Sequence, residues 1–187
     1  MRQARTICLE RDLPGVAVPA GYPVTLRAGE VVAVVQALGG SVTLQSVRGE
    51  LVRVGARELD ALGSEAGGYE AGTTLAPVSA PGTTPVEGVL EQLRQVYDPE
   101  IPVNVVDLGL VYRCEAAPLE QQGGWRVEID LSMTAPGCGM GDILAEEAGN
   151  RALAVPGVAE VRVELVWDPP WDLSRLSDAA RLQLGLI

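Results

Sequence analysis

The sequence contains no histidine and no lysine, and these two absences exclude several kinds of functional site. Without histidine, the chain's own residues cannot form Ser-His-Asp or Cys-His catalytic groups, HExxH protease sites or histidine-ligated zinc sites. All 14 cationic residues are arginine, so neither a P-loop lysine nor a Schiff-base lysine is available. Any chemistry must therefore depend on cysteines and carboxylates.

Cysteine is also scarce, with only Cys8, Cys114 and Cys138 in the chain. They are odd in number and widely spaced, without a CxxC pair, so the pattern indicates neither a disulfide framework nor a zinc site. Charges interrupt the first residues before an apolar core of signal-peptide length, and no later run is long enough to span a membrane. We therefore expect a protein of the reducing cytoplasm.

Positive charge is in short supply as well, because the chain has a formal net charge of -11. Neutralising phosphate groups requires clustered cations, so we expect no binding to nucleic acid or to anionic membranes. The composition, 47% hydrophobic and 21% charged, is that of a globular protein. The length of 187 residues suits one ordinary domain or two small ones.

Changes in composition divide the chain into three parts and predict an α+β protein. Residues 1–62 form short β-branched runs with glycine turns roughly every ten residues, which predicts a small all-β barrel or sandwich. Residues 63–84 are rich in glycine and proline and predict a linker. Residues 85–187 predict an α/β sandwich in the order helix, strand, strand, helix, strand, helix. In the first module the predicted strands include a run around Cys8, which we interpret as structural, and Pro23–Leu26, Glu30–Gln36, Ser41–Val47 and Leu51–Val54.

The second module begins with a predicted helix. Thr84, Pro85 and Glu87 suggest a capping box, and Pro99 should end the helix near Tyr97. The later predicted elements are a strand from Val105 onwards, a strand over Trp125–Met133, a helix over Asp142–Val155 with Leu153 facing inward, a strand that begins at Val158 and ends at the Trp167 segment, and a helix from Ser177 to Gly185.

Cys138 lies between the second of these strands and the long helix, in a glycine-rich turn. Unpaired amide groups and the helix dipole at a helix start favour an anion, so a thiol there should ionise readily. Cys138 is a candidate nucleophile or metal ligand; alternatively, it is a small apolar residue that fills a tight turn. The glycines at 137, 139 and 141 also suggest a nucleotide site, but the third glycine of GxGxxG and a phosphate-binding lysine are missing, so we expect no nucleotide.

Carboxylates precede this turn in two segments. Asp98 and Glu100 lie in a loop that two prolines stiffen, and Asp107 falls on the strand predicted from Val105. Simpler roles are open for two of them, since Asp98 could begin a turn and Asp107 could cap or brace the backbone. Cys114 shares a strand face with apolar residues, which predicts a buried thiol without a chemical role.

Several separated motifs then point to a family. The segments Asp98–Pro102 and Asp107–Tyr112, together with Thr134 four residues before Cys138, resemble the domain of unknown function shared by PaaD-like and eukaryotic cytosolic iron–sulfur assembly proteins. The resemblance covers roughly Pro85 to Asp168. Within that family, the N-terminal β module with Gln36–Ser41 and the tail Trp167–Trp171 are similar to SufT-type iron–sulfur cluster assembly proteins.

The resemblance implies an auxiliary factor, not an enzyme, that matures or transfers iron–sulfur clusters to client proteins in the cytoplasm. Cys138 would be a cluster or iron ligand, and Asp98, Glu100, Asp107 and Thr134 would line the same site. Because one chain cannot provide four cysteine ligands here, any cluster would be transient and shared with a second copy in a homodimer, a small thiol, or a carrier or scaffold protein. The alternatives are a metal-free adaptor for assembly partners, with Trp167–Trp171 as contact surface, and a thiol-dependent enzyme with Cys138 as nucleophile.

Overall fold

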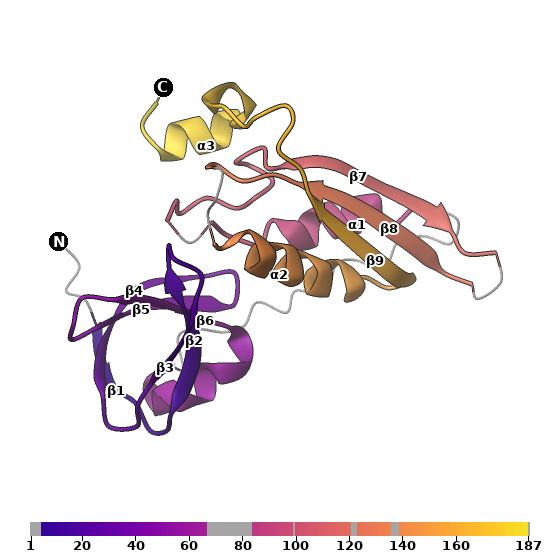
Figure 1. The fold of residues 1–187 in the computed structure, drawn as a ribbon. Coiled ribbons are helices and arrows are strands. Elements are labelled where there is room, and N and C mark those ends of the chain that lie inside the picture. Colours follow the sequence, from indigo (N-terminus) through magenta and orange to yellow (C-terminus); the bar gives the residue numbers. More distant parts are fainter. Residues whose placement is uncertain (1–4, 67–83, 99, 121–122, 136–138, 187) are drawn as a thin grey trace. The chain divides into compact units, whose positions relative to one another are not determined.

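The computed structural model describes residues 5–66, 84–98, 100–120, 123–135 and 139–186, which form two compact units. Each unit contains its own sheet, and Figure 1 shows the elements along the chain. The predicted mixture of helices and sheets is confirmed. Among the described residues, the structure contains no helix with the length and apolarity that crossing a membrane requires.

The first unit is a strongly curved antiparallel sheet of six strands in the order β1-β4-β5-β6-β2-β3 (Figure 1). Both residues of the β4–β5 turn, Gly39 and Gly40, have positive φ angles of 61° and 78°, as a tight hairpin turn requires. The strand β2 was not predicted, because its Pro14 and Gly15 interrupt a strand pattern. The strands are β1 (Arg5–Cys8), β2 (Leu13–Val18), β3 (Pro23–Leu26), β4 (Val31–Leu38), β5 (Ser41–Ser46) and β6 (Leu51–Val54).

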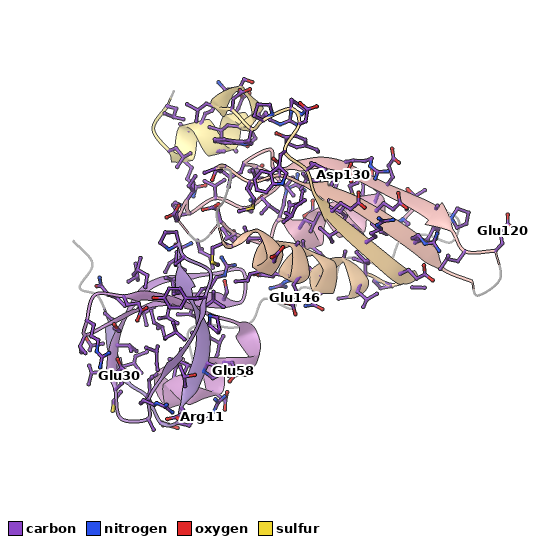
Figure 2. The ribbon with its side chains drawn as sticks, viewed as in Figure 1. Arg11, Glu30, Glu58, Glu120, Asp130 and Glu146 are labelled. Atoms are coloured by element: carbon purple, nitrogen blue, oxygen red, sulfur yellow. The ribbon has the colours of Figure 1, made fainter. Side chains whose placement is uncertain are left out.

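Apolar side chains from these strands and from the 3-10 segment η1 (Ala56–Ala66) form the core of this unit. On β1 the side chain of Ile7 is buried, whereas Cys8 next to it is exposed. On the surface Arg11 forms ion pairs with Glu58 at 2.8 Å and with Asp60 at 2.6 Å (Figure 2). Because η1 continues beyond residue 62 and residues 67–83 are not described, most of the predicted linker lies outside the described residues.

The second unit is a three-stranded sheet with two helices packed on one face (Figure 1). Strands β7 and β8 are antiparallel, and α2 connects β8 to the parallel strand β9. Alternate residues of β8 are buried beneath the helices, whereas Glu146 on α2 is exposed and points away from the sheet (Figure 2). The elements are α1 (Val86–Leu93), β7 (Val111–Pro118), β8 (Trp125–Leu131), α2 (Gly141–Leu153), β9 (Val158–Leu165), η2 (Leu173–Arg175) and α3 (Asp178–Gln183).

Three local predictions in this unit are wrong. The predicted capping box is absent, because the cap of α1 is Pro85 and no side chain bonds to that cap. The helix ends at Leu93 and not near Tyr97, since Tyr97 pairs with Asn104 instead. On α2 the buried stripe has a spacing of four residues and ends at Ala152, so Leu153 lies beyond it and is 51% exposed.

The strand predicted from Val105 onwards is also wrong, because residues 105–109 form a turn and β7 begins only at Val111. Val105 and Leu108 are buried while Val106 is only partly buried. This three-residue spacing is that of a helical turn and not the two-residue alternation of a strand. Cys114 does lie on β7, where it is half-buried.

Candidate functional site

Asp107 lies in a single helical turn that spans residues 104–110. The turn begins at Asn104, whose side-chain Oδ1 accepts hydrogen bonds from the backbone N–H groups of Val106 at 3.1 Å and Asp107 at 2.9 Å. Asn104 Nδ2 also donates to Asp107 Oδ2 at 2.6 Å. Asn104 therefore acts as a helix N-cap and at the same time orients the Asp107 carboxylate.

The turn ends at Gly109, which has a φ angle of +68°. The amide of Gly109 donates to the carbonyl of Val106, and the amide of Leu110 donates to that of Val105, both at 2.9 Å. These two bonds and the left-handed glycine make a Schellman motif. Asn104 was missed as a site residue, although an N-cap residue followed three positions later by an acid was a readable signal.

Asp98 is joined to this turn through the backbone. Its amide donates to the carbonyl of Val103 at 3.3 Å, and the neighbouring residue Tyr97 forms an antiparallel bridge with Asn104. The Asp98 side chain is 3% exposed, which is unusual for a carboxylate. Glu100 differs from it, because the Glu100 side chain is exposed.

The loop with Thr134 starts beside the same turn. The amide of Ser132 donates to the carbonyl of Leu110 at 2.8 Å, at the end of the Asp107 turn. Ser132 is 1% exposed, and its Oγ atom has no hydrogen-bond partner among the residues that the structure describes. A buried hydroxyl without a hydrogen-bond partner costs free energy. Thr134 is two residues further on and partly exposed.

Cys138 lies outside the described residues, but the two ends of its loop are anchored. Met133 and Met140 are 3% and 0% exposed. A Cβ atom on Gly141, the first residue of α2, would lie 3.0 Å from Leu165 Cδ1 at the end of β9. The helix starts at Gly141, three residues after Cys138 and one residue before the predicted limit at Asp142.

Backbone hydrogen bonds thus connect the segment of Asp98 to that of Asp107, and the segment of Asp107 to that of Thr134, at one end of the three-stranded sheet. Within the described parts of the chain, no group of three or more histidine, cysteine or acidic residues could hold a metal ion.

The two other thiols, of Cys8 and Cys114, differ in their surroundings. Burial raises the pKa of Cys114 to about 11, with a smaller contribution from the nearby Glu115 charge. The thiol of Cys114 is therefore protonated at neutral pH, whereas metals bind the thiolate. Cys8 is exposed on the first compact unit. With three cysteines in all, one copy of the chain cannot supply four cysteine ligands to a cluster.

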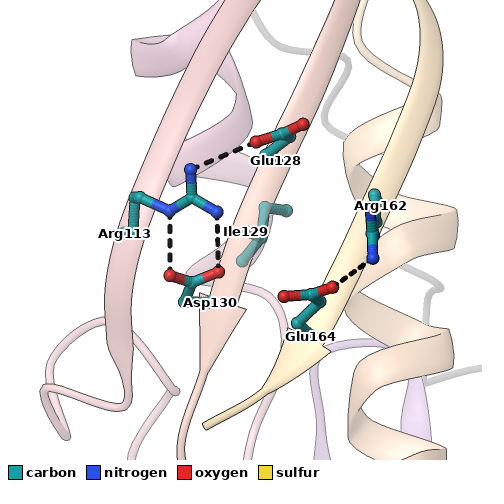
Figure 3. Close-up of a pocket in the computed structure, with 6 residues that line it drawn as sticks. All are labelled: Arg113, Glu128, Ile129, Asp130, Arg162 and Glu164. Carbon is teal, nitrogen blue, oxygen red and sulfur yellow. Dashed lines mark hydrogen bonds and ion pairs between the residues drawn. The ribbon is translucent and has the colours of Figure 1, made fainter.

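The opposite face of the sheet carries charged side chains, with Arg113 among them (Figure 3). Arg113 binds Asp130 through two nitrogens at 2.8 and 3.1 Å, and it contacts Glu128 at 3.1 Å. Arg162 pairs with Glu164 beside them. These residues line a depression of about 30 Å³, which holds about one water molecule. Its charges pair with one another.

Comparison with known proteins places the second unit in a family. Residues 87–165, from the second residue of α1 to the end of β9, match the family described as "Iron-sulfur cluster assembly protein". The chain is 38% identical over 101 residues to an Fe-S protein maturation auxiliary factor of Porphyromonas gingivalis, covering 54% of this chain and 91% of that protein.

This chain is also 32% identical over 91 residues to the Fe-S protein maturation auxiliary factor SufT of Staphylococcus aureus, and the match covers 49% of this chain and 98% of that protein. A crystal structure of a domain of unknown function from Bacillus anthracis is similar at 33% identity and a TM-score of 0.47, covering 55% of this chain and 92% of that one. The chain therefore belongs to the iron–sulfur cluster assembly protein family.

Proposed function

We propose that this chain is an auxiliary factor in iron–sulfur protein maturation, acting through a site that includes Asp98, Glu100, Asp107, Thr134 and Cys138. The observation that supports this site is the backbone connection of the Asp98, Asp107 and Thr134 segments, all of which lie within residues 87–165, the part of the chain that matches the family. The relatives named as maturation factors support the function itself.

In this proposal an iron–sulfur cluster is cargo and not a resident cofactor. Cys138 supplies one thiolate ligand, and the remaining ligands come from a second copy of the chain, a small thiol or a partner protein. A site with so few ligands of its own releases its cargo easily. Asn104 orients the Asp107 carboxylate by donating a hydrogen bond to it at 2.6 Å. The partners are carrier or scaffold proteins and client apoproteins, in a reducing cytoplasm that protects the thiolate.

The proposal is tested with a purified client protein from which the cluster has been removed. The client is incubated anaerobically with ferrous iron, sulfide and dithiothreitol, with and without this chain. We expect the chain to accelerate the return of the client's cluster absorbance and activity. The same rate in both reactions, across several clients, would overturn the proposed function.

A metal-free adaptor is the second candidate. It is favoured by the missing ligand cluster among the described residues and by the protonated Cys114. The two candidates are separated by incubating the chain alone with ferrous iron and sulfide and recording the visible absorbance of an iron–sulfur cluster. Absorbance that follows the protein through a desalting column supports cluster transport, whereas a colourless protein that still accelerates maturation supports the adaptor.

We also propose that the chain consists of an all-β domain over residues 1–62, a linker over 63–84 and an α/β sandwich domain over 85–187. The separate sheets and the two compact units support this division. Brief proteolysis with thermolysin should cut first within residues 63–84 and leave two resistant fragments. First cuts inside either sheet would contradict the division.

A further inference from the structure

In the helical turn that contains Asp107, three backbone carbonyl groups have no hydrogen-bond donor within the turn itself. The carbonyl groups of residues 104–106 accept hydrogen bonds from the amides of residues 108–110, inside the turn. The next three carbonyl groups, of residues 107–109, point beyond the end of the turn, where helical hydrogen bonding stops. Such groups need donors from elsewhere when they are shielded from water.

All three donors come from one segment that follows β9. Trp171 Nε1 donates to the middle carbonyl, that of Leu108, at 2.7 Å. The carbonyl of the next residue, Gly109, accepts a hydrogen bond from Arg175 Nε at 3.2 Å. The carbonyl before it, that of Asp107 itself, accepts from the amide of Ser177 at 2.9 Å. We call residues 171–177 the C-terminal strap.

The strap also packs closely against the turn. A Cβ atom on Gly109 would lie 2.2 Å from the carbonyl oxygen of Arg175, so only glycine permits this approach. The guanidinium of Arg175 lies 3.6 Å from the centre of the Tyr112 ring, a cation–π contact. Leu176 is 5% exposed. The strap therefore contacts the Asp107 turn through both of its ends, Trp171 and Ser177, and through Arg175 between them.

We propose that Trp171 and Arg175 are positioning residues that hold the Asp107 turn, and with it the Asp107 carboxylate, in the geometry that maturation requires. This inference rests on the proposed function, because it assigns the strap a role through Asp107. The strap lies outside residues 87–165, so it extends the site beyond the segment that matches the family. Bonds to three consecutive carbonyls fix the turn without touching the carboxylate, which stays available to cargo or a partner.

The first test measures whether the strap orders the turn. Trp171→Phe keeps an aromatic ring and removes the Nε1–H donor, while Trp125→Phe is the matched control, since Trp125 begins β8 at the end of the sheet away from the turn. Hydrogen exchange followed by mass spectrometry should show amides 105–110 exchanging about tenfold faster in Trp171→Phe, the effect of losing one partly buried hydrogen bond. Equal exchange in the two variants would refute the strap's contact with the turn.

The second test measures whether the strap acts through Asp107, using the client-maturation assay. Loss of an outer partner of a site residue costs about 10- to 100-fold in activity, and we expect about tenfold for Trp171→Phe and little change for Trp125→Phe. The double variant Trp171→Phe/Asp107→Asn should be no slower than Asp107→Asn alone, because the two residues serve one role. Losses that multiply would show that Trp171 acts independently of Asp107 and would refute the inference.

The outcomes separate this inference from the proposed function. If the wild-type chain does not accelerate maturation, the proposed function fails. If Asp107→Asn slows maturation and Trp171→Phe does not, only the positioning role fails. Should Trp171→Phe fold poorly, Arg175→Met provides the same comparison, with Arg162→Met on the charged sheet face as its control. Arg175→Met removes the Nε donor and keeps an unbranched apolar side chain.

Discussion

Replacing Asn104 with alanine removes three hydrogen bonds from the turn that holds Asp107. Two of them, at 3.1 and 2.9 Å, are N-cap bonds from backbone amides to Asn104 Oδ1. Loss of such a cap costs about 1 kcal/mol. The third is donated to the Asp107 carboxylate at 2.6 Å. Hydrogen bonds to charged groups contribute about 1.5–3 kcal/mol when buried, and we take about 1 because Asp107 is partly exposed to water. We therefore expect the second unit to lose about 2 kcal/mol of unfolding free energy.

Urea unfolding followed by tryptophan fluorescence measures this loss directly. All three tryptophans, at 125, 167 and 171, belong to the second unit, so their signal reports that unit alone. Asn150→Ala is a matched control, because Asn150 is exposed on α2 and alanine favours a helix. Asn104→Ser should recover the capping part of the loss, since serine is also a good N-cap, but not the bond to the carboxylate. A change below about 0.5 kcal/mol for Asn104→Ala, within the range of ordinary surface substitutions, would refute this account of the turn.

Three further predictions concern the same unit. Gly109→Ala should destabilise it by about 2 kcal/mol more than Gly185→Ala in urea unfolding, because both glycines have positive φ but only Gly109 meets backbone atoms of the strap; equal losses would contradict this. Burial raises the pKa of Cys114 to about 11, so iodoacetamide at neutral pH should modify it at least about tenfold more slowly than the exposed Cys8, measured by peptide mass spectrometry. Hydrogen bonds from an arginine lower the pKa of Asp130; this stabilisation is present above the unfolded-state pKa of about 3.9 and is lost as pH falls through the lower folded-state value. The urea concentration at the unfolding midpoint should therefore decrease as the pH is lowered below about 4. The decrease should be smaller in Asp130→Asn.

The sequence predicts the elements of this protein best where their periodicity is simple. Pro23–Leu26 and Leu51–Val54 form strands with the predicted limits, because β-branched residues alternate there and glycine or proline marks the ends. The last helix begins after Ser177 as predicted, since the serine side chain accepts a hydrogen bond from the amide of Ala180. The family predicted from motifs such as Asp98–Pro102 is confirmed.

The Asp107 turn could not be predicted in the same way. The valines at 103, 105 and 106 are typical of a strand. However, Asn104 caps a helical turn and Gly109 ends it with a left-handed conformation, so these two residues determine the backbone conformation. The contact between the strap and the turn could not be predicted from the sequence either, because the donors at Trp171 and Arg175 are more than sixty residues along the chain from the carbonyls to which they donate. Local patterns describe single elements, whereas contacts over such distances depend on the fold.

The central claim is that maturation proceeds through Cys138, and its most direct test compares two thiol variants in the client-maturation assay. Cys138→Ser replaces the proposed ligand with a hydroxyl, and Cys8→Ser replaces an exposed thiol of the first unit in the same way. The account predicts that Cys138→Ser loses the acceleration of client maturation while Cys8→Ser retains it, with both proteins equally stable in urea. Full acceleration by Cys138→Ser would contradict the account.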